Sequence, residues 1–320
     1  MKILACNSNR PLAEAISAYL GLPLTRASVR RFSDMEVFVE IDENVRGEDV
    51  FVIQSTSYPA NDHLMELLVT LDALKRSSAR RVTAVMPYYG YARQDRKSAP
   101  RTPISAKLVA NLITTAGADR VLTLDLHSGQ IQGYFDAPFD HLTALPLLSS
   151  YLKDEVGLSG DDLVVVAPDA GRIKTSEKLR EYLHADLAYI YKRRSRHEAH
   201  KISEMRLVYE EDIAGRPCIM VDDMIDTGGT LVQGVNVLAS MGAGPIYAGA
   251  THAIFSGKAR QTLEEAPIEQ VIVTNTVPIP EEKQFSKLRV LSIAPLVASA
   301  LRAVFEESSV SEIFGGANQV

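Results

Sequence analysis

The stretch that decides the fold runs Cys218-Ile219-Met220-Val221-Asp222-Asp223-Met224-Ile225-Asp226-Thr227-Gly228-Gly229-Thr230. Its first four residues are apolar and predict a short buried strand. The apolar residues between Leu231 and Leu238 predict the helix that follows. Strands that alternate with helices in this way are typical of a mostly parallel sheet covered by helices on both faces.

The turn between this strand and helix carries three acids, two threonines and a glycine pair. The glycines let backbone N–H groups approach a ligand closely, and the N-terminus of a helix favours an anion. Asp222 and Asp223 stand where open α/β sheets bind ligands, at the carboxyl end of a strand. The backbone amides of the turn can bind a phosphate, and the adjacent carboxylates can bind the two hydroxyls of a ribose. Together they indicate a phosphorylated sugar as the ligand. The alternative is an ordinary strand, turn and helix in which Asp and Thr only cap the helix.

The composition indicates a soluble globular protein with two domains. The chain has 320 residues, 46% of them hydrophobic and 23% charged. Its net charge of -6 argues against a general nucleic-acid binder. Cys6 and Cys218 both lie in apolar runs, which favours core residues in a reducing compartment over a disulfide. Without a signal-peptide pattern or a membrane-length apolar run, we expect a cytoplasmic protein.

The order of elements repeats within the chain. Gly47 precedes an apolar strand, a helix and a second strand, and Gly215 precedes the same series. When these glycines are aligned, Gln54 and Ser55 fall where Asp222 and Asp223 stand. The sequence therefore predicts two related α/β domains, of which only the second carries the diol-binding acids. We expect the boundary near residues 142–148, with domains of 1–145 and 146–320.

Residues 221–230 resemble the phosphoribosyl-binding signature of type I phosphoribosyltransferases and of ribose-phosphate pyrophosphokinases. A second segment separates these two families. Residues 87–97, Pro-Tyr-Tyr-Gly-Tyr-Ala-Arg-Gln-Asp-Arg-Lys, offer three tyrosines as a stacking face and three cations as phosphate partners. On composition alone they are equally a solvated loop. They resemble the ATP-binding segment of ribose-phosphate pyrophosphokinases, residues 101–107 continue the match, and base-salvage phosphoribosyltransferases have no such segment. Residues 32–36 resemble the second ATP-contacting loop of the same family, where a smaller residue often stands in place of Met35.

This resemblance implies two sets of binding residues. For ATP they are Phe32, Asp34, Met35, Glu36, Arg93, Gln94, Asp95 and Lys97. For ribose 5-phosphate they are Arg194, Asp222, Asp223, Asp226, Thr227, Gly228, Gly229 and Thr230.

The resemblance also implies a metal site and a catalytic loop. His127 and Asp169 match the family's magnesium-site residues, with Asp125, Asp136 and Asp140 as weaker candidates. After Asp169 the family commonly has two adjacent glycines, whereas this chain has Gly171 and Arg172. Lys192 and Arg194 match the two catalytic cations of a mobile loop, here about residues 192–204. From the residues alone this stretch is either a solvated basic loop or a lid that brings cations to a polyphosphate.

Residues 308–314, Ser-Ser-Val-Ser-Glu-Ile-Phe, resemble the tail of the phosphate-activated, ADP-inhibited members of the family, where it helps to form an allosteric site between subunits. Without this resemblance they would be a frayed terminus. The chain is thus identified as a member of the ribose-phosphate pyrophosphokinases, with two tandem type I phosphoribosyltransferase-like α/β domains. The resemblance implies an Mg²⁺-dependent transferase that makes phosphoribosyl pyrophosphate and AMP from ATP and ribose 5-phosphate. It further implies phosphate and ADP as effectors and a homohexamer. The alternatives are a salvage phosphoribosyltransferase and a non-catalytic regulatory relative.

Overall fold

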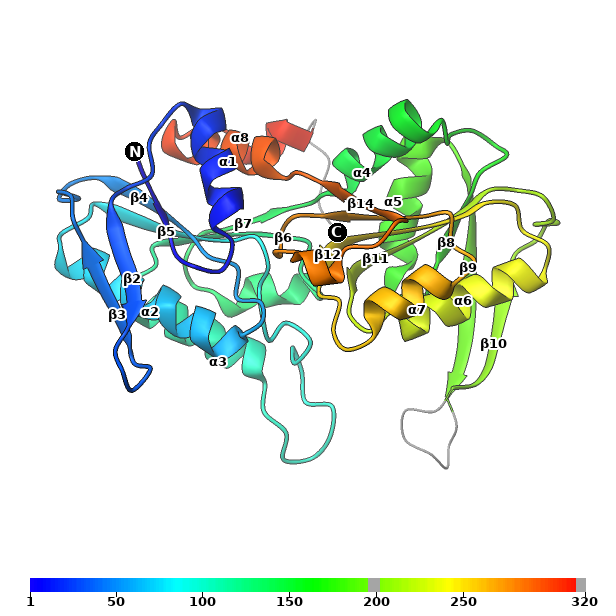
Figure 1. Ribbon diagram of the computed structural model, residues 1–320, viewed down its shortest axis with the longest axis horizontal. Coiled ribbons are helices and arrows are strands. Elements are labelled where there is room, and N and C mark those ends of the chain that lie inside the picture. The colour runs from blue at the N-terminus through cyan, green and yellow to red at the C-terminus, as the bar shows by residue number, and fades with distance from the viewer. Residues whose placement is uncertain (195–201, 315–320) are drawn as a thin grey trace. The chain divides into compact units, whose positions relative to one another are not determined.

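The computed structural model describes residues 1–194 and 202–314 and divides the chain into two compact units (Figure 1). Unit 1 holds residues 1–143, 276–278 and the described residues from Ser292 onward. Unit 2 holds residues 144–275 and 279–291. The chain thus leaves unit 1 close to the expected boundary. The second domain is not one continuous segment, however, because the carboxyl-terminal helix α8 (Ala294–Phe305) packs against α1 (Arg10–Leu20) in unit 1.

Unit 1 is built on a five-stranded, fully parallel sheet in the order β1-β4-β5-β6-β7, beside a two-stranded hairpin of β2 and β3. Helices α2 and α3 cover one face of the sheet, and α1 and α8 lie on the other (Figure 1). Its remaining elements are β1 (Lys2–Ala5), β2 (Ala27–Arg31), β3 (Val37–Ile41), β4 (Asp49–Ile53), α2 (Ala60–Arg76), β5 (Arg81–Met86), α3 (Ser105–Ala116), β6 (Arg120–Leu124), a 3₁₀ helix (Gly129–Tyr134), β7 (Phe139–Leu142) and the 3₁₀ turn η5 (Val310–Phe314).

Unit 2 is built on a seven-stranded sheet in the order β10-β9-β8-β11-β12-β13-β14, parallel except for the antiparallel pair β9 and β10. Helices α4 and α5 pack on one face, and α6 and α7 on the other (Figure 1). Its elements are α4 (Leu145–Tyr151) with a π turn (Leu152–Val156), β8 (Val164–Ala167), the 3₁₀ turn η3 (Ala170–Arg172), α5 (Ile173–Leu183), β9 (Asp186–Arg194), β10 (Ile202–Val208), β11 (Cys218–Ile225), α6 (Gly229–Ser240), β12 (Ile246–Ala253), α7 (Ala259–Glu265), β13 (Gln270–Thr274), a 3₁₀ turn (Glu281–Lys283) and β14 (Leu288–Leu291).

The two glycines that mark the repeat make the same contact in their own units. The Gly47 N–H donates to the Ser78 carbonyl, just after α2, at 2.9 Å. The Gly215 N–H donates to the Gly242 carbonyl, just after α6, at 2.8 Å. Each contact joins the start of a strand to the end of the helix that follows it. The predicted correspondence between the strand–helix–strand segments is therefore supported by a shared backbone contact.

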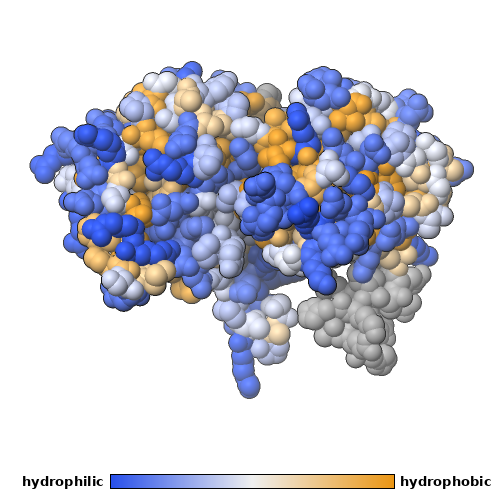
Figure 2. Space-filling view, in the orientation of Figure 1, coloured by the Kyte–Doolittle hydropathy of each residue, from blue (hydrophilic) through white to orange (hydrophobic). Residues whose placement is uncertain are grey.

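The apolar residues of each unit are buried between its sheet and its helices, as the runs in the sequence predict. Cys6 and Cys218 are both buried free thiols, in agreement with the prediction that they are core residues. Burial raises the pKa of each thiol to about 12. Within residues 1–194 and 202–314, no helix has the length and apolar character needed to span a membrane. The face drawn in Figure 2 is mainly hydrophilic, with smaller hydrophobic areas between charged side chains.

Candidate active site

The carboxylates Asp222 and Asp223 lie on the carboxyl-terminal half of β11. This strand continues to Ile225, four residues beyond the expected end, because β12 keeps pairing with it as far as Ile225. On its other side, β8 pairs with β11 only as far as Met220. The turn that follows β8 is thereby brought next to the two carboxylates, at the edge where parallel α/β sheets bind ligands.

The turn from Asp226 to Thr230 leads directly into α6, a 12-residue helix. Gly228 caps the helix with φ 76°, a left-handed conformation that glycine adopts without strain. The side chains of Thr227 and Thr230 are exposed. Exposed hydroxyls and the backbone N–H groups at a helix N-terminus together form a site suited to a phosphate.

Arg172 contacts both carboxylates of the pair. Its Nε lies 2.8 Å from Oδ1 of Asp222, and a terminal guanidinium nitrogen lies 2.7 Å from Oδ1 of Asp223. The Asp223 N–H also donates to Asp222 Oδ1 at 2.8 Å. Burial and the neighbouring Asp223 carboxyl raise the pKa of Asp222 to about 7, although the Arg172 guanidinium opposes this rise. No role for Arg172 could be predicted from the sequence, since no local pattern indicates that residue 172 lies beside residue 222.

Asp169 begins the turn after β8, three residues before Arg172. Its Oδ1 accepts the Gly171 N–H at 3.0 Å, which fixes the carboxylate at the start of η3. The side chain is half-buried. Carboxylate oxygens are the ligands that Mg²⁺ prefers, and the ion usually keeps several waters or substrate phosphates as well. Asp169 therefore has donor chemistry that fits the predicted magnesium role.

The backbone of Lys192 and Arg194 belongs to the last residues of β9. The expected loop of residues 192–204 is thus shorter than predicted, because β9 continues through Arg194 and β10 begins at Ile202. Residues 195–201 of the predicted loop lie outside the described residues. The strand β10 escaped prediction because polar residues interrupt it, although Met205 and Leu207 alternate and pack against the core.

In unit 1, residues 32–36 form the tight turn of the β2–β3 hairpin. The Phe32 N–H donates to the Glu36 carbonyl at 2.9 Å, and the Asp34 carboxylate accepts the Glu36 N–H at 3.2 Å. Met35 has φ 73° and an exposed side chain. Phe32 is 46% exposed and packs edge-on against Phe38 at 5.3 Å between ring centres. The hairpin therefore presents an aromatic ring and two acids to a ligand.

Residues 87–97 follow β5, and they divide between core and surface. Tyr89 is buried, and its hydroxyl donates to the Ala106 carbonyl at 2.8 Å. The idea of three tyrosines forming a stacking face is thus wrong for Tyr89, because this ring packs in the core beside α3. Arg93, Gln94 and Lys97 are exposed, and Asp95 is half-buried. The cations predicted to meet phosphates are accessible within unit 1.

His127 follows β6 and is half-buried. Asp140, a weaker metal candidate, pairs with Leu122 in the sheet and forms a 2.6 Å ion pair with Arg120, which begins β6. That pairing gives Asp140 a cationic partner of its own. In the part of the chain that the structure describes, no group of three or more His, Cys, Asp or Glu side chains is placed to hold a metal ion. Any Mg²⁺ bound here would depend on water and substrate oxygens.

The counterpart of the carboxylate pair in unit 1 is occupied by the chain's own polar groups. Gln54 follows β4, and its side chain donates to Glu66 on α2 at 2.9 Å and accepts the Ser8 N–H at 2.9 Å. Ser55 donates to the Thr276 carbonyl at 2.6 Å. All of these groups are buried. Gln54 and Ser55 thus take part in internal hydrogen bonds at the place where unit 2 carries its two carboxylates.

The fold and the site together define an α/β protein in which a turn suited to a phosphate follows a strand that carries two adjacent carboxylates. Comparison with known proteins identifies the family within this class. Residues 1–117 match the N-terminal domain of ribose phosphate pyrophosphokinase, and residues 197–315 match the phosphoribosyl synthetase-associated domain. The chain belongs to the ribose-phosphate pyrophosphokinase family, whose members are enzymes that make phosphoribosyl pyrophosphate and AMP from ATP and ribose 5-phosphate.

Similar proteins extend over nearly the whole chain. A ribose-phosphate pyrophosphokinase of Granulibacter bethesdensis is 57% identical over 98% of this chain and 100% of its own length. The enzyme of that name from Bacillus caldolyticus is 49% identical over 98% of each chain. The crystal structure of phosphoribosylpyrophosphate synthetase from Mycobacterium smegmatis has a TM-score of 0.89 and 47% identity, covering 96% of this chain and 99% of that one. These comparisons confirm the predicted family and the expected α/β fold of two phosphoribosyltransferase-like domains.

Proposed function

We propose that this chain transfers the pyrophosphoryl group of ATP to the 1-hydroxyl of ribose 5-phosphate, with unit 2 holding the acceptor sugar. The observation that carries this proposal is the turn after β11, where Asp222 and Asp223 precede the phosphate-binding start of α6. The 5-phosphate binds the N–H groups and hydroxyls of residues 226–230. The two carboxylates accept hydrogen bonds from the sugar hydroxyls. Both ends of the sugar are thereby fixed before it reacts.

Unit 1 contributes the ATP contacts in this proposal. The nucleoside of ATP binds the exposed Phe32 ring and the acids Asp34 and Glu36. The rest of the nucleotide binds Arg93, Gln94, Asp95 and Lys97. Aromatic faces suit a base, and exposed cations suit phosphates.

The chemistry needs positive charge more than a protein nucleophile. The sugar 1-hydroxyl attacks the β-phosphorus in line: its oxygen bonds to that phosphorus, and its proton passes to water. The bond between the β-phosphorus and the oxygen that bridges to the α-phosphate breaks, which releases AMP. Lys192 and Arg194 stabilise the charge of the transferring group and of the leaving AMP. His127 and Asp169 would hold Mg²⁺, which when bound neutralises charge on the phosphates.

The nucleotide product tests this function. Full-length protein incubated with ATP, Mg²⁺ and ribose 5-phosphate should release AMP, with phosphoribosyl pyrophosphate as the other product. ADP in its place would identify an ordinary kinase. No turnover would favour a non-catalytic relative, and consumption of phosphoribosyl pyrophosphate with a free base would favour a salvage phosphoribosyltransferase.

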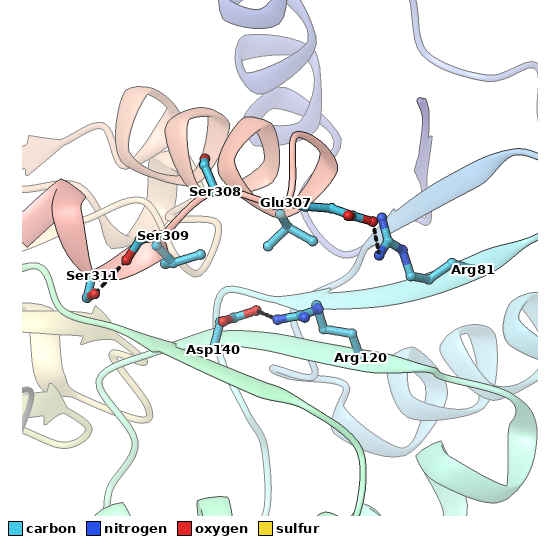
Figure 3. Close-up of a pocket in the computed structure, with 9 residues that line it drawn as sticks. Arg81, Arg120, Asp140, Glu307, Ser308, Ser309 and Ser311 are labelled. Atoms are coloured by element: carbon cyan, nitrogen blue, oxygen red, sulfur yellow. Dashed lines mark hydrogen bonds and ion pairs between the residues drawn. The ribbon is translucent and has the colours of Figure 1, made fainter.

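We extend the proposal to phosphate and ADP as effectors. A cavity of about 540 Å³ in unit 1 is lined by two arginines and by serines of the tail (Figure 3). Arg81 and Arg120 supply guanidinium groups, which pair with the lining acids Glu307 at 3.7 Å and Asp140 at 2.6 Å, while Ser309 and Ser311 supply hydroxyl groups. The tail is ordered here, since Ser308 donates its N–H to the Ala303 carbonyl and η5 follows. Such a cavity suits a phosphate group.

Assembly and location complete the proposal. The resemblance supports a homohexamer acting in the cytoplasm, and the two buried free thiols suit a reducing compartment. Analytical ultracentrifugation of the full chain should give the mass of six chains. A stable monomer would contradict the assembly without affecting the assignment of the reaction.

A further inference from the structure

Arg172 bridges the two carboxylates that the proposed function assigns to the sugar. It stands in the turn after β8, and its side chain reaches across to β11, where it contacts Asp222 at 2.8 Å and Asp223 at 2.7 Å. The side chains of Arg172 and Asp223 are well shielded, with 14% and 4% exposed, whereas that of Asp222 is 29% exposed. A guanidinium is planar and presents its donors in a fixed geometry. One such group bonded to two carboxylates therefore fixes their mutual orientation.

The arginine also influences the charge of the pair. Two shielded carboxylates in contact favour a state in which one carries a proton, because like charges repel and burial disfavours ionisation. A protonated carboxyl donates a hydrogen bond and offers fewer acceptor positions to a sugar hydroxyl. A guanidinium beside both oxygens favours the ionised form of each. Arg172 thus opposes the proton that burial and the neighbouring carboxyl favour on Asp222, and it increases the share of the pair that can accept hydrogen bonds from two hydroxyls.

The backbone at this position leaves the side chain free to be changed. Arg172 has φ -105° and ψ 3°, which any residue adopts, and it stands immediately before α5. The neighbouring contact, from the Gly171 N–H to Asp169, does not involve the Arg172 side chain. Substitutions at 172 therefore act on the carboxylate pair more than on the course of the turn.

We propose that Arg172 is a positioning residue that gives this turn its selectivity for a sugar phosphate with two adjacent hydroxyls, by holding Asp222 and Asp223 as a pair of acceptors. The inference rests on the proposed function of that pair as the diol site. Arg172 acts through the carboxylates, so its loss should matter most when both hydroxyls are present. The loss of Arg172 should weaken the binding of a sugar phosphate that lacks the 2-hydroxyl much less.

The experiment compares two sugars in the full-length protein with saturating ATP and Mg²⁺. The KM for ribose 5-phosphate is measured together with the inhibition constant of 2-deoxyribose 5-phosphate as its competitor. Arg172→Ala should raise the KM about tenfold or more, equivalent to about 1.4 kcal/mol, and change the inhibition constant several-fold less. Arg172→Gln keeps a polar side chain but no charge, and should do the same. Arg216→Ala is the matched control, because Arg216 pairs with Asp186 at 2.6 Å just before the opposite end of β11.

The outcomes separate the inference from the function on which it rests. If the wild-type protein binds both sugars equally, the diol role of Asp222 and Asp223 fails, and the inference fails with it. If the wild type binds ribose 5-phosphate more tightly than 2-deoxyribose 5-phosphate and both Arg172 variants keep the wild-type ratio of the inhibition constant to the KM, the inference about Arg172 is overturned. That result leaves the diol role of Asp222 and Asp223 intact. A ratio that falls equally in Arg216→Ala would also overturn the inference about Arg172. Should Arg172→Ala not fold, Arg172→Gln decides the question by the same ratio.

Discussion

Gln54 and Glu66 are joined by a buried hydrogen bond, with Gln54 Nε2 2.9 Å from Glu66 Oε2. The bond lies at the strand end in unit 1 that corresponds to Asp222 in unit 2. Glu66 also accepts from Asn7 on both of its oxygens, at 3.0 and 3.3 Å. The same place in the repeat is thus filled by internal hydrogen bonds in one unit and by a carboxylate pair in the other. In unit 1 this place is closed by internal contacts, whereas in unit 2 it carries the two carboxylates of the proposed sugar site.

Glu66→Gln should therefore destabilise the protein without weakening sugar binding. An amide puts a donor where Glu66 now accepts, so one buried donor loses its partner at a cost of roughly 1–3 kcal/mol. Urea unfolding measures the loss, and the KM for ribose 5-phosphate should not change. Glu14→Gln is the control, because Glu14 forms an exposed i,i+4 pair with Arg10 that is worth little. Equal stability of the two variants would contradict a structural role for the Gln54–Glu66 bond.

Gly90→Ala should damage ATP binding. A Cβ at Gly90 would lie 2.3 Å from the Thr56 carbonyl oxygen, which is backbone and cannot turn aside. The turn that carries Arg93 to Lys97 must shift, and overpacking of this kind costs about 1–3 kcal/mol. The KM for ATP should rise more than the KM for ribose 5-phosphate. Gly133→Ala has open space around its Cβ and serves as the control in unit 1. If the KM for ATP rises equally in Gly133→Ala and Gly90→Ala, the close approach of Gly90 to the Thr56 carbonyl is not the cause of the rise.

The free energy of unfolding should fall at acid pH because Asp49 becomes protonated. Arg80 bonds this buried carboxylate at 2.9 and 2.6 Å, and Arg81 bonds it at 2.8 Å. These bonds hold the pKa of Asp49 below its ordinary value. The pKa of Asp49 is lower in the folded state than in the unfolded state. The stability that ionised Asp49 contributes is therefore complete above the unfolded pKa of about 3.9, and it is lost as the pH falls toward the folded pKa. The stability gap between wild type and Asp49→Asn should be largest at neutral pH and shrink below about pH 4. A gap that stays constant with pH in urea unfolding would refute this.

Much of the fold could be predicted from local patterns, and the contacts that complete the site could not. The apolar run from Cys218 to Val221 located the first half of β11, because buried parallel strands are continuous hydrophobic segments. The return of α8 to unit 1 depends on packing between distant segments, which no local pattern encodes. The contact of Arg172 with Asp222 is of the same kind, since it follows from β8 pairing beside β11. Tyr89 was misread because a tyrosine in a polar stretch shows its burial only in three dimensions.

The cavity of the tail predicts a charge-sensitive response to phosphate. Ser309→Asp would add a negative charge to a cavity lined by Arg81 and Arg120, and like charges disfavour a bound anion. Activation by inorganic phosphate should then need a several-fold higher phosphate concentration, while the KM values for both substrates at saturating phosphate should stay near those of the wild type. Ser299→Asp on α8 is the control, because Ser299 is not among the residues that line the cavity. An unchanged phosphate response in Ser309→Asp would remove this cavity as the effector site.

Lys192→Ala should slow turnover and leave sugar binding nearly intact. Charge on the transferring pyrophosphoryl group grows as the reaction proceeds, so a cation that meets it stabilises the transition state more than the bound substrates. Loss of one such group costs about 10²–10³ in kcat, whereas the KM for ribose 5-phosphate should change little because that sugar binds at residues 222–230. Arg206→Ala is the matched control, since Arg206 is an exposed cation of the paired strand β10, opposite Tyr191. Steady-state kinetics on both variants decide the matter. A kcat close to wild type in Lys192→Ala would exclude Lys192 from the chemistry, and an equal loss in Arg206→Ala would mean that the hairpin, rather than the Lys192 charge, is required.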